Sequence, residues 1–316
     1  MKHIQGALEQ RQSLPLKAKI AMAKRRIKEW YHHYDGDVFV SFSGGKDSTV
    51  LLHLARTMYP DIKAMFLDTG VEYPEIRTFV RTWSNVDWVR PKKRFHQVVK
   101  DHGYPVVSKR VAQYIHEYRV GRALHGKAET ATMKLRRTGV KPDGRSFRSG
   151  QIPAKWWFLV DAPFKVSHRC CYHLKKAPSK RYEKQTGLRP ILGTMAAESG
   201  QRALTWRQQG CNSFTGRPVS APLSVWTDTD IWEYLRKYDV AYCPLYDQGH
   251  TRTGCMFCAF GAQHPNNPKF KLLQAQHPRI YQHALDQLGL GPVLNAIGAL
   301  PDPPSKVVGS GGDPPP

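Results

Sequence analysis

The chain has 316 residues, 41% of them hydrophobic and 11% aromatic, a composition that excludes a wholly disordered protein. No apolar run approaches the roughly 20 residues of a membrane-spanning helix, and the first residues lack the apolar core of a secretion signal. We therefore expect a cytoplasmic protein with no membrane partner. The net charge of +23 makes nucleic acid a natural partner, and a merely solvated basic surface is the alternative.

The chain begins with a helical pattern and continues with a strand pattern. Residues 7–33 carry apolar side chains at helical spacing among many basic ones, which predicts a long helix at the edge of a domain. Residues 38–42 (VFVSF) form a short β-prone run bounded by polar residues. Such a run suits a buried strand of a parallel sheet, whose two faces are both covered by helices.

The segment SGGKDS, residues 43–48, connects this strand to a second helical pattern. Its two glycines interrupt the strand, and Ser48 is placed to cap a helix over residues 49–58. Such a turn leaves backbone N–H groups free at the positive end of a helix, where a phosphate or pyrophosphate binds. The ammonium of Lys46 would add a point charge. The alternative is an ordinary turn between a strand and a helix.

A second strand pattern over residues 62–67 ends at Asp68 and Thr69, with Glu72 shortly after. Open α/β sheets bind ligands beyond the carboxyl ends of their strands, so these polar residues are candidates for contact with a ligand. A turn cap is the alternative role for Asp68. A helix over residues 74–80 and a third strand over residues 86–89 are expected to follow.

Residues 108–165 form a basic insertion. Over residues 108–155 the chain has twelve Lys and Arg but only three Asp and Glu, so this stretch holds nine of the net positive charges. We expect a helix around residues 111–119 and then a flexible basic arm, because the rest is rich in Gly and Ser and weakly periodic. Such an arm closes over a ligand, lies along a phosphate backbone or is simply a solvated loop.

Strand character returns at residues 188–193, and Glu198 and Arg202 follow. An arginine here suits a bidentate contact with a phosphate or sulfate, and a surface helix with an Arg–Glu pair is the alternative. Further on, Thr227 or Asp228 is expected to cap another helix.

Four of the six cysteines fall into two groups, the adjacent pair Cys170 and Cys171 and the Cys255-x-x-Cys258 pair. In an intracellular chain such groups indicate metal or redox chemistry. Zinc normally takes paired C-x-x-C knuckles, whereas the spread corners of a [4Fe–4S] cluster accommodate adjacent cysteines more easily. We favour the cluster over zinc and over free buried thiols. Cys243 is close enough in sequence to replace one ligand.

Residues 43–48 resemble the SGGxDS loop of the adenine-nucleotide α-hydrolase superfamily, often called PP-loop ATP pyrophosphatases. Further segments resemble the phosphoadenosine phosphosulfate (PAPS) and adenylylsulfate reductase family within it. They are LDTGVEYPE at 67–75, CCYHLKKAP at 170–178, TMAAESGQR at 194–202 and YDQGHTRTGCMFC at 246–258. Met195 departs from the pattern, because this family usually has an arginine there.

The resemblance implies an α/β, Rossmann-like fold, with a parallel sheet flanked by helices, a basic insertion and a cysteine-rich C-terminal part. The domain plan is a helical segment at 1–35, a nucleotide-binding domain at 36–260, a helical segment at 261–300 and a disordered Pro/Gly-rich tail at 301–316.

The resemblance also implies site residues and cofactors. A [4Fe–4S] cluster would be held by Cys170, Cys171, Cys255 and Cys258. Lys46, Asp47 and Arg202 would be catalytic, with Mg²⁺ as a further cofactor. The nucleotide, ATP or an adenylylsulfate, would contact Ser43, Gly44, Gly45, Lys46, Asp47, Ser48, Asp68, Thr69, Gly193 and Glu198.

Three functions are compatible with these motifs. Reductases of this family attack the sulfate sulfur with a cysteine of a C-terminal C-G-L-H element, whereas this sequence has no cysteine after Cys258. We therefore favour sulfur transfer by ATP-dependent adenylation of an acceptor, such as tRNA or DNA, with release of pyrophosphate. The cluster would carry or deliver the sulfur, and a sulfur donor is an expected partner. The alternative is a sulfonucleotide reductase with a relocated or partner-supplied thiol, which forms sulfite with a thioredoxin-like reductant. A non-catalytic Fe–S nucleotide-binding subunit on nucleic acid is the second alternative.

Overall fold

The computed structural model describes residues 6–126 and 128–301, which form two compact units. The first unit comprises the described residues up to 101 together with residues 169–255. The second comprises residues 102–168 and the described residues from 256 onward. Apart from Pro301, the predicted disordered tail lies outside the described residues. None of the described helices combines the length and the apolar character that crossing a membrane requires.

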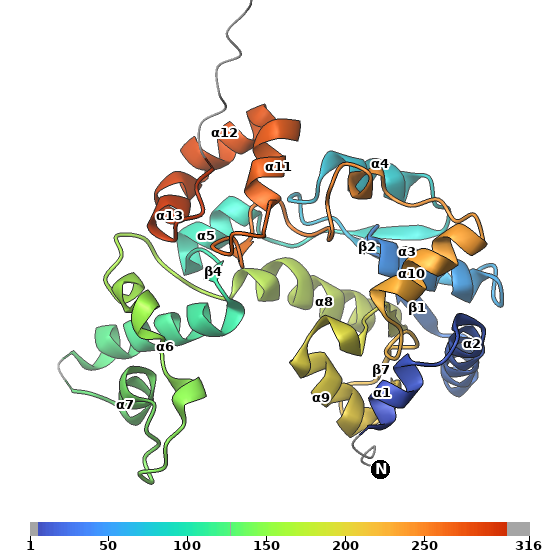
Figure 1. The fold of residues 1–316 in the computed structure, drawn as a ribbon, viewed down its shortest axis with the longest axis horizontal. Coiled ribbons are helices and arrows are strands. Elements are labelled where there is room, and N and C mark those ends of the chain that lie inside the picture. The colour runs from blue at the N-terminus through green and yellow to red at the C-terminus, as the bar shows by residue number, and fades with distance from the viewer. Residues whose placement is uncertain (1–5, 127, 302–316) are drawn as a thin grey trace, which may run out of the picture. The chain divides into compact units, whose positions relative to one another are not determined.

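A six-stranded sheet forms the centre of the first unit (Figure 1). Its order is β3 (Val86–Val89), β2 (Lys63–Leu67), β1 (Val38–Ser41), β5 (Arg189–Leu192), β7 (Val219–Ser220) and β6 (Asn212–Ser213). All neighbours are parallel except β6 and β7. The α/β fold with a mostly parallel sheet is thus confirmed. The chain order reverses at β1, which pairs with β2 on one side and with β5 on the other, and ligands bind beside such a reversal.

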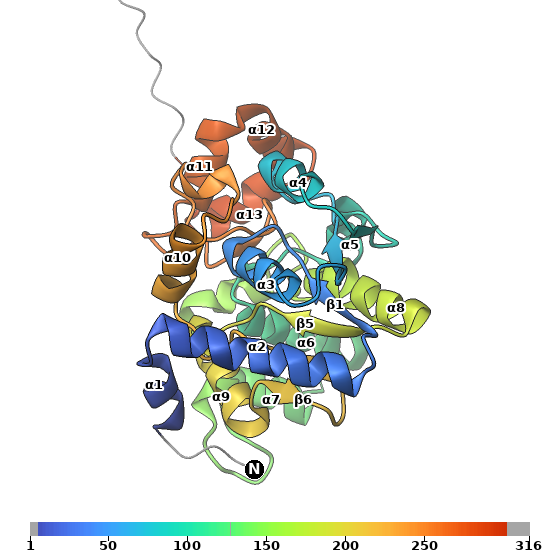
Figure 2. The same ribbon diagram turned by 90° about the vertical axis from the view of Figure 1, so that its right-hand side faces the viewer.

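Helices cover both faces of this sheet (Figure 2). Phe39 of β1 and Met65 of β2 form a buried cluster with Tyr182 of α8 (Ala177–Thr186), which also packs against β3. Because side chains alternate along a strand, Val38 and Val40 point to the opposite face, where α3 (Lys46–Arg56) packs against β1. Also in contact with α3 are α2 (Leu16–His33) and α10 (Asp228–Lys237). The other helices of this part are α1 (Ala7–Gln12), α4 (Pro74–Arg81), α5 (Phe95–His102) and α9 (Gly200–Gln209).

Most elements expected in the first unit are present, with two corrections. The strands at 62–67, 86–89 and 188–193 are confirmed to within one residue, and Thr227 caps α10 with a hydroxyl that accepts from Asp230 N–H. The prediction of a single helix over 7–33 is wrong. Pro15 lacks a backbone N–H, and the helix is interrupted before α2. The predicted start of α3 at residue 49, with Ser48 as its cap, is also wrong. Its N-cap is Gly45, and Ser48 instead donates to the Gly45 carbonyl at 2.9 Å within the first turn.

The second unit contains the basic insertion and the C-terminal helices. A two-stranded parallel sheet joins β4 (Val106–Val107) to β8 (Ala259–Phe260), and the helices are α6 (Lys109–His125), α7 (Ala131–Thr138), α11 (Lys269–Gln276), α12 (Pro278–Asp286) and α13 (Leu290–Ala296). The prediction of a flexible arm after the first helix was wrong. Thr130 caps α7, and Arg136 donates to Glu117 of α6 at 2.8 Å, so the two helices are tied together.

Five short helical turns complete the described chain. They are the 3₁₀ turns Arg148–Gly150, Ala154–Val160, Ala196–Glu198 and Pro244–Tyr246, and a π-type turn at Tyr172–Lys176. The π-type turn directly precedes α8, and such wide turns are often found at functional sites.

Candidate active site

A cavity of about 550 Å³ lies in the first unit, beyond the carboxyl ends of β1, β2 and β5. Each of these strands contributes a residue to its wall, respectively Ser41, Leu67 and Leu192. The other lining residues are Ser43, Gly45, Lys46, Asp47, Ser48, Lys175, Lys176, Ser179, Gly193, Thr194, Glu198, Arg202, Arg217, Tyr246, Thr251, Arg252 and Thr253. The cavity is therefore where an open α/β sheet binds its ligand, and its size suits a nucleotide.

The SGGKDS loop forms one side of this cavity, but three of its N–H groups already have partners. Lys46 N–H donates to the Tyr246 hydroxyl at 2.9 Å, and Ser43 N–H donates to the Ser48 hydroxyl at 3.1 Å. Gly45 N–H makes a long bond of 3.4 Å to the Ser43 hydroxyl. The expectation of free N–H groups is thus wrong for these three. A phosphate oxygen that approached the start of α3 would compete with Tyr246.

Lys46 is the buried cation of the loop, with only 4% of its surface exposed. Its ammonium donates to Asp228 at 2.5 Å and to Asp47 at 2.9 Å. Burial opposes its charge, but the hydrogen bonds to Asp228 and Asp47 outweigh burial and raise the pKa of Lys46. Lys46 is therefore a fixed positive charge in the cavity wall.

A second charged group in the cavity wall surrounds Glu198. This carboxylate pairs with Arg202, one helical turn later, and also accepts from Arg252 at 2.5 Å. Burial lowers the pKa of Arg202, and the neighbouring Arg252 lowers it further. The Arg–Glu pair that the sequence offered as an alternative is present, and Arg202 still lines the cavity.

Positive charge dominates the cavity wall. Six of the lining residues are lysines or arginines, and two, Asp47 and Glu198, are carboxylates. Such an excess of cations within a concave surface attracts a ligand with several negative charges. A phosphorylated or sulfated nucleotide meets that requirement.

Two glycines make the close packing of this region feasible. A Cβ at Gly193 would lie 3.1 Å from the Asp47 carbonyl oxygen, so only glycine lets the end of β5 approach the first turn of α3 this closely. Gly44 has a φ of +72°, and a Cβ there would lie 2.9 Å from Val80. Gly44 therefore shapes the loop without lining the cavity.

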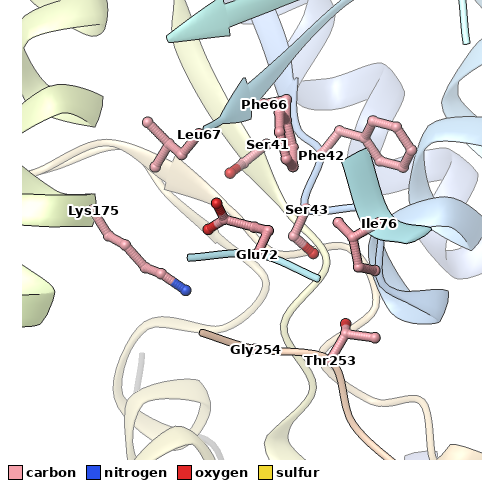
Figure 3. Close-up of a pocket in the computed structure, with 10 residues that line it drawn as sticks. All are labelled: Ser41, Phe42, Ser43, Phe66, Leu67, Glu72, Ile76, Lys175, Thr253 and Gly254. Atoms are coloured by element: carbon pink, nitrogen blue, oxygen red, sulfur yellow. The ribbon is translucent and has the colours of Figure 1, made fainter. Parts of the chain in front are cut away.

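The structure does not bring Asp68 and Thr69 to the cavity. Asp68 is 4% exposed and accepts from Arg77 and Arg90, each at 3.2 Å. Thr69 donates to Glu72 through its N–H at 2.9 Å and its hydroxyl at 2.6 Å. These groups organise the turn after β2, and Glu72 lines a smaller adjoining cavity (Figure 3).

Lys175 connects the cavity of about 550 Å³, here called the nucleotide cavity, to the cysteines. It lies on the π-type turn before α8 and lines both cavities, and Figure 3 shows it extending into the smaller one together with Glu72. Its pKa is raised, chiefly by attraction to Cys255 against the effect of burial, with further contributions from Glu72, Cys171 and a hydrogen bond to Cys255. Two thiols of the candidate metal set are therefore neighbours of a cation that faces the nucleotide cavity.

The four predicted cysteine ligands do not all belong to one unit. Cys170, Cys171 and Cys255 belong to the first unit, and Cys258 belongs to the second. Within the described ranges, no three His, Cys, Asp or Glu side chains are grouped so as to hold a metal ion. The cluster therefore stays a prediction. Cys243 is fully buried, and burial raises the pKa of its thiol to about 11, which suits a protonated structural thiol.

Sequence reasoning missed several residues of the cavity. Tyr246, Arg252 and Thr253 come from the segment before the C-x-x-C pair, for which the sequence indicates a role only in the cysteine motif. A Cβ at Gly45 would lie 2.7 Å from the Thr253 hydroxyl, so this segment packs directly on the loop. Lys175 was likewise present in the CCYHLK pattern without a role. Each motif contributes to the same cavity.

The sequence profile of the phosphoadenosine phosphosulfate reductase domain matches residues 37–139 and 134–260, more than half of the chain and all parts of this cavity. The chain belongs to the PAPS reductase family. It is 27% identical over 233 residues to adenosine 5′-phosphosulfate reductase of Staphylococcus epidermidis, a match that covers 73% of this chain and 74% of the relative. It is 25% identical over 232 residues to phosphoadenosine 5′-phosphosulfate reductase of Xanthomonas axonopodis pv. citri, covering 73% and 75%.

A solved PAPS reductase of Candida auris, in complex with phosphate, is 14% identical. That similarity covers 81% of this chain and 97% of the other, with a TM-score of 0.43. Family membership agrees with the resemblance predicted from the motifs, and the chain is an enzyme of this family.

Proposed function

We propose that the chain is a sulfonucleotide reductase, which binds an adenylylsulfate or its 3′-phosphorylated form in the cavity and transfers the sulfo group to a thiol. One observation carries the proposal: six lysines and arginines and only two carboxylates line the cavity beyond the strand ends, a balance of charge that suits a phosphorylated and sulfated nucleotide. The relatives named as sulfonucleotide reductases support the same function. The findings thus favour the function that the sequence offered as an alternative.

The reaction requires two thiols for each sulfite formed. A thiolate of a thioredoxin-like dithiol, rather than a cysteine of the proposed cluster, attacks the sulfur of the sulfo group, so that a sulfur–sulfur bond forms and the bond from sulfur to the phosphate oxygen breaks. The adenylate leaves with the electron pair of that bond. The second thiol of the same dithiol then attacks the sulfenyl sulfur, releases sulfite and closes the disulfide. Lys46 and Arg202 would stabilise the charge that develops on the leaving phosphate.

We further propose that Cys170, Cys171, Cys255 and Cys258 hold a [4Fe–4S] cluster, with zinc as the less favoured metal. The donor chemistry fits, because thiolates are soft ligands and the ammonium of Lys175 beside Cys255 and Cys171 would compensate their negative charge. When bound, the cluster would supply a polarisable anionic group.

Replacing Cys255 with serine is expected to lower the iron content of anaerobically purified protein, because a serine hydroxyl is a poor substitute for a thiolate ligand. Nucleotide affinity should be largely retained, since Cys255 does not line the main cavity. Cys211→Ser is the matched control, because Cys211 lies outside both cysteine groups. Chemical determination of iron and visible absorbance measure the effect. Iron content equal to that of the control would reject the ligand assignment.

A second candidate is ATP-dependent adenylation of an acceptor, and the loop itself favours it. The carboxylate of Asp47 lines the cavity beside Lys46 and offers an oxygen ligand for Mg²⁺. An acceptor oxygen would attack the α-phosphorus of ATP, and the bond to the departing pyrophosphate would break. Sulfur from a separate donor would then displace the adenylate. The acceptor would be a nucleic acid such as tRNA or DNA.

Turnover by cluster-replete protein distinguishes these functions. ATP, adenylylsulfate and phosphoadenylylsulfate are offered separately with a dithiol reductant, with and without tRNA or DNA, and both sulfite and pyrophosphate are followed. Sulfite from either sulfonucleotide is the expected result. If ATP yields pyrophosphate only when nucleic acid is present, and no sulfite forms, the result would reject the reductase and support the second candidate. Bound nucleotide without either product would reject both in favour of a non-catalytic subunit.

A further inference from the structure

A row of lysines runs along α8, away from the nucleotide cavity. Lys176, at the start of this helix, is followed at intervals of four residues by Lys180 and Lys184, so the three lie on one face. All three are exposed. Lys176 lines the nucleotide cavity, whereas Lys180 and Lys184 line a separate hollow of about 520 Å³. The row therefore leads from one cationic site to another.

The second hollow, here called the basic hollow, is a fixed part of the first unit. Lys92 and Lys93 come to it from the segment after β3, and Arg181 comes from α8. The guanidinium of Arg181 donates to the Arg90 carbonyl at 2.6 Å. In addition, the Tyr182 hydroxyl donates to Asp87 of β3 at 2.7 Å. These two bonds hold the two walls of the basic hollow against each other.

Positive charge continues beyond Arg90 into a third hollow, here called the tryptophan hollow. It measures about 470 Å³ and is lined by Arg77, Arg81, Trp88 and Arg90. The guanidinium of Arg81 lies over the partly buried ring of Trp88, 5.5 Å from its centre. An accessible aromatic ring among arginines is the arrangement on which nucleic-acid bases stack.

The charge of these two hollows is largely uncompensated. Eight lysines and arginines line them, and no carboxylate does. Asp101 pairs with Lys93, and Asp68 pairs with Arg77 and Arg90. Among the described residues no carboxylate forms an ion pair with the remaining cations of the row and the hollows, which include Arg81, Lys92, Lys180 and Lys184. A ligand with repeated negative charges would supply what is missing.

We propose that the lysine row, the basic hollow and the tryptophan hollow bind the backbone of a single-stranded nucleic acid, which runs along α8 to the mouth of the nucleotide cavity. The lysine row alone spans eight helical residues, about 12 Å at ~1.5 Å per residue, so it offers contacts to more than one phosphate. The ring of Trp88 favours bases over an acidic peptide. This inference goes beyond the reduction of a sulfonucleotide. It also gives the ATP-dependent candidate a place for its acceptor.

The double substitution Lys180→Glu/Lys184→Glu tests this surface. The expected result is a loss of affinity of at least about tenfold for a labelled single-stranded oligonucleotide, measured by fluorescence anisotropy at ~0.1 M salt. The dependence of log K on log salt should also become shallower by about 1.4, since each lost phosphate contact removes ~0.7 on single strands. The control Lys17→Glu/Lys28→Glu makes the same change in net charge at exposed positions of α2 and should retain nearly full affinity.

Several outcomes would overturn the inference. One is a wild-type protein that does not bind the oligonucleotide, and another is an equal loss of affinity in both double variants, which would indicate an effect of net charge alone. Competition by polyglutamate as effective as that by unlabelled oligonucleotide would instead indicate an acidic polypeptide partner.

Sulfite formation, measured without nucleic acid, keeps this test separate from the proposed reductase activity. The Lys180→Glu/Lys184→Glu variant should form sulfite at nearly the wild-type rate, because neither lysine lines the nucleotide cavity. Absence of sulfite from the wild type would reject the reductase and leave the binding result intact.

Discussion

Replacing Lys46 with methionine is expected to lower the affinity for the nucleotide about 10- to 100-fold, and kcat/KM by at least as much. The ammonium of Lys46 is the buried cation of the SGGKDS loop, and a hydrogen bond to a charged group is worth about 1.5–3 kcal/mol. Its removal also leaves Asp47 and Asp228 without the positive charge that now neutralises them. An incoming phosphate would then meet two carboxylates.

Isothermal titration with each nucleotide measures this effect, and Lys63→Met is the matched control. Lys63 begins β2, lies outside the cavity and is exposed, 3.8 Å from Asp87. The Lys46 variant should still fold, because the side chains of Asp47 and Asp228 retain 27% and 66% exposure and water can solvate them. Nucleotide affinity equal to that of the Lys63 variant would refute the role of the loop in binding.

The SGGKDS loop also shows what local sequence can and cannot predict. A β-prone run, two glycines and a helical pattern are neighbours along the chain, so their succession is visible without tertiary structure. The long-range partners of Lys46 are not visible in the local sequence. Tyr246 and Asp228 lie 200 and 182 residues away, and nothing in their local pattern associates them with the loop. Consequently the position of the loop was predictable, whereas the occupation of its N–H groups was not.

Asp68 illustrates a second limit. Its position at the carboxyl end of β2 was predicted, because strand ends follow from hydrophobic patterning. The direction of its side chain depends instead on Arg77 and Arg90, which draw the carboxylate away from the cavity. A strand-end rule places a residue at the correct edge of a sheet but does not predict with which neighbour its side chain will form an ion pair.

The prediction of a flexible arm in the basic insertion is wrong for a different reason. Gly, Ser and charged residues weaken the helical period over 127–150, and the sequence therefore reads as a loop. Helix α7 forms there because tertiary contacts outweigh local preference. Met133 of α7 is 4% exposed, and Arg136 bonds to Glu117 of α6. Its burial was not visible from a period of 3.6 residues.

Replacing Asp230 with alanine is expected to lower the free energy of unfolding by about 3–5 kcal/mol, because it would leave the ammonium of Lys19 buried without a partner. Lys19 of α2 donates to both carboxylate oxygens of Asp230 of α10, at 2.9 and 2.7 Å. The two side chains are only 3% and 9% exposed, so water cannot replace the lost partner. The substitution also removes the acceptor for Thr227 at the start of α10.

A double-mutant cycle with Lys19→Met separates the ion pair from the helix cap. Lys19→Met alone should cost less than Asp230→Ala, because Asp230 would keep both hydrogen bonds from Thr227. The double variant should be more stable than Asp230→Ala, since no unpaired buried charge remains in it. Urea denaturation followed by circular dichroism measures all four proteins. Additive effects of the two substitutions, or a loss below about 1 kcal/mol for Asp230→Ala, would mean that the pair is not what joins α2 to α10.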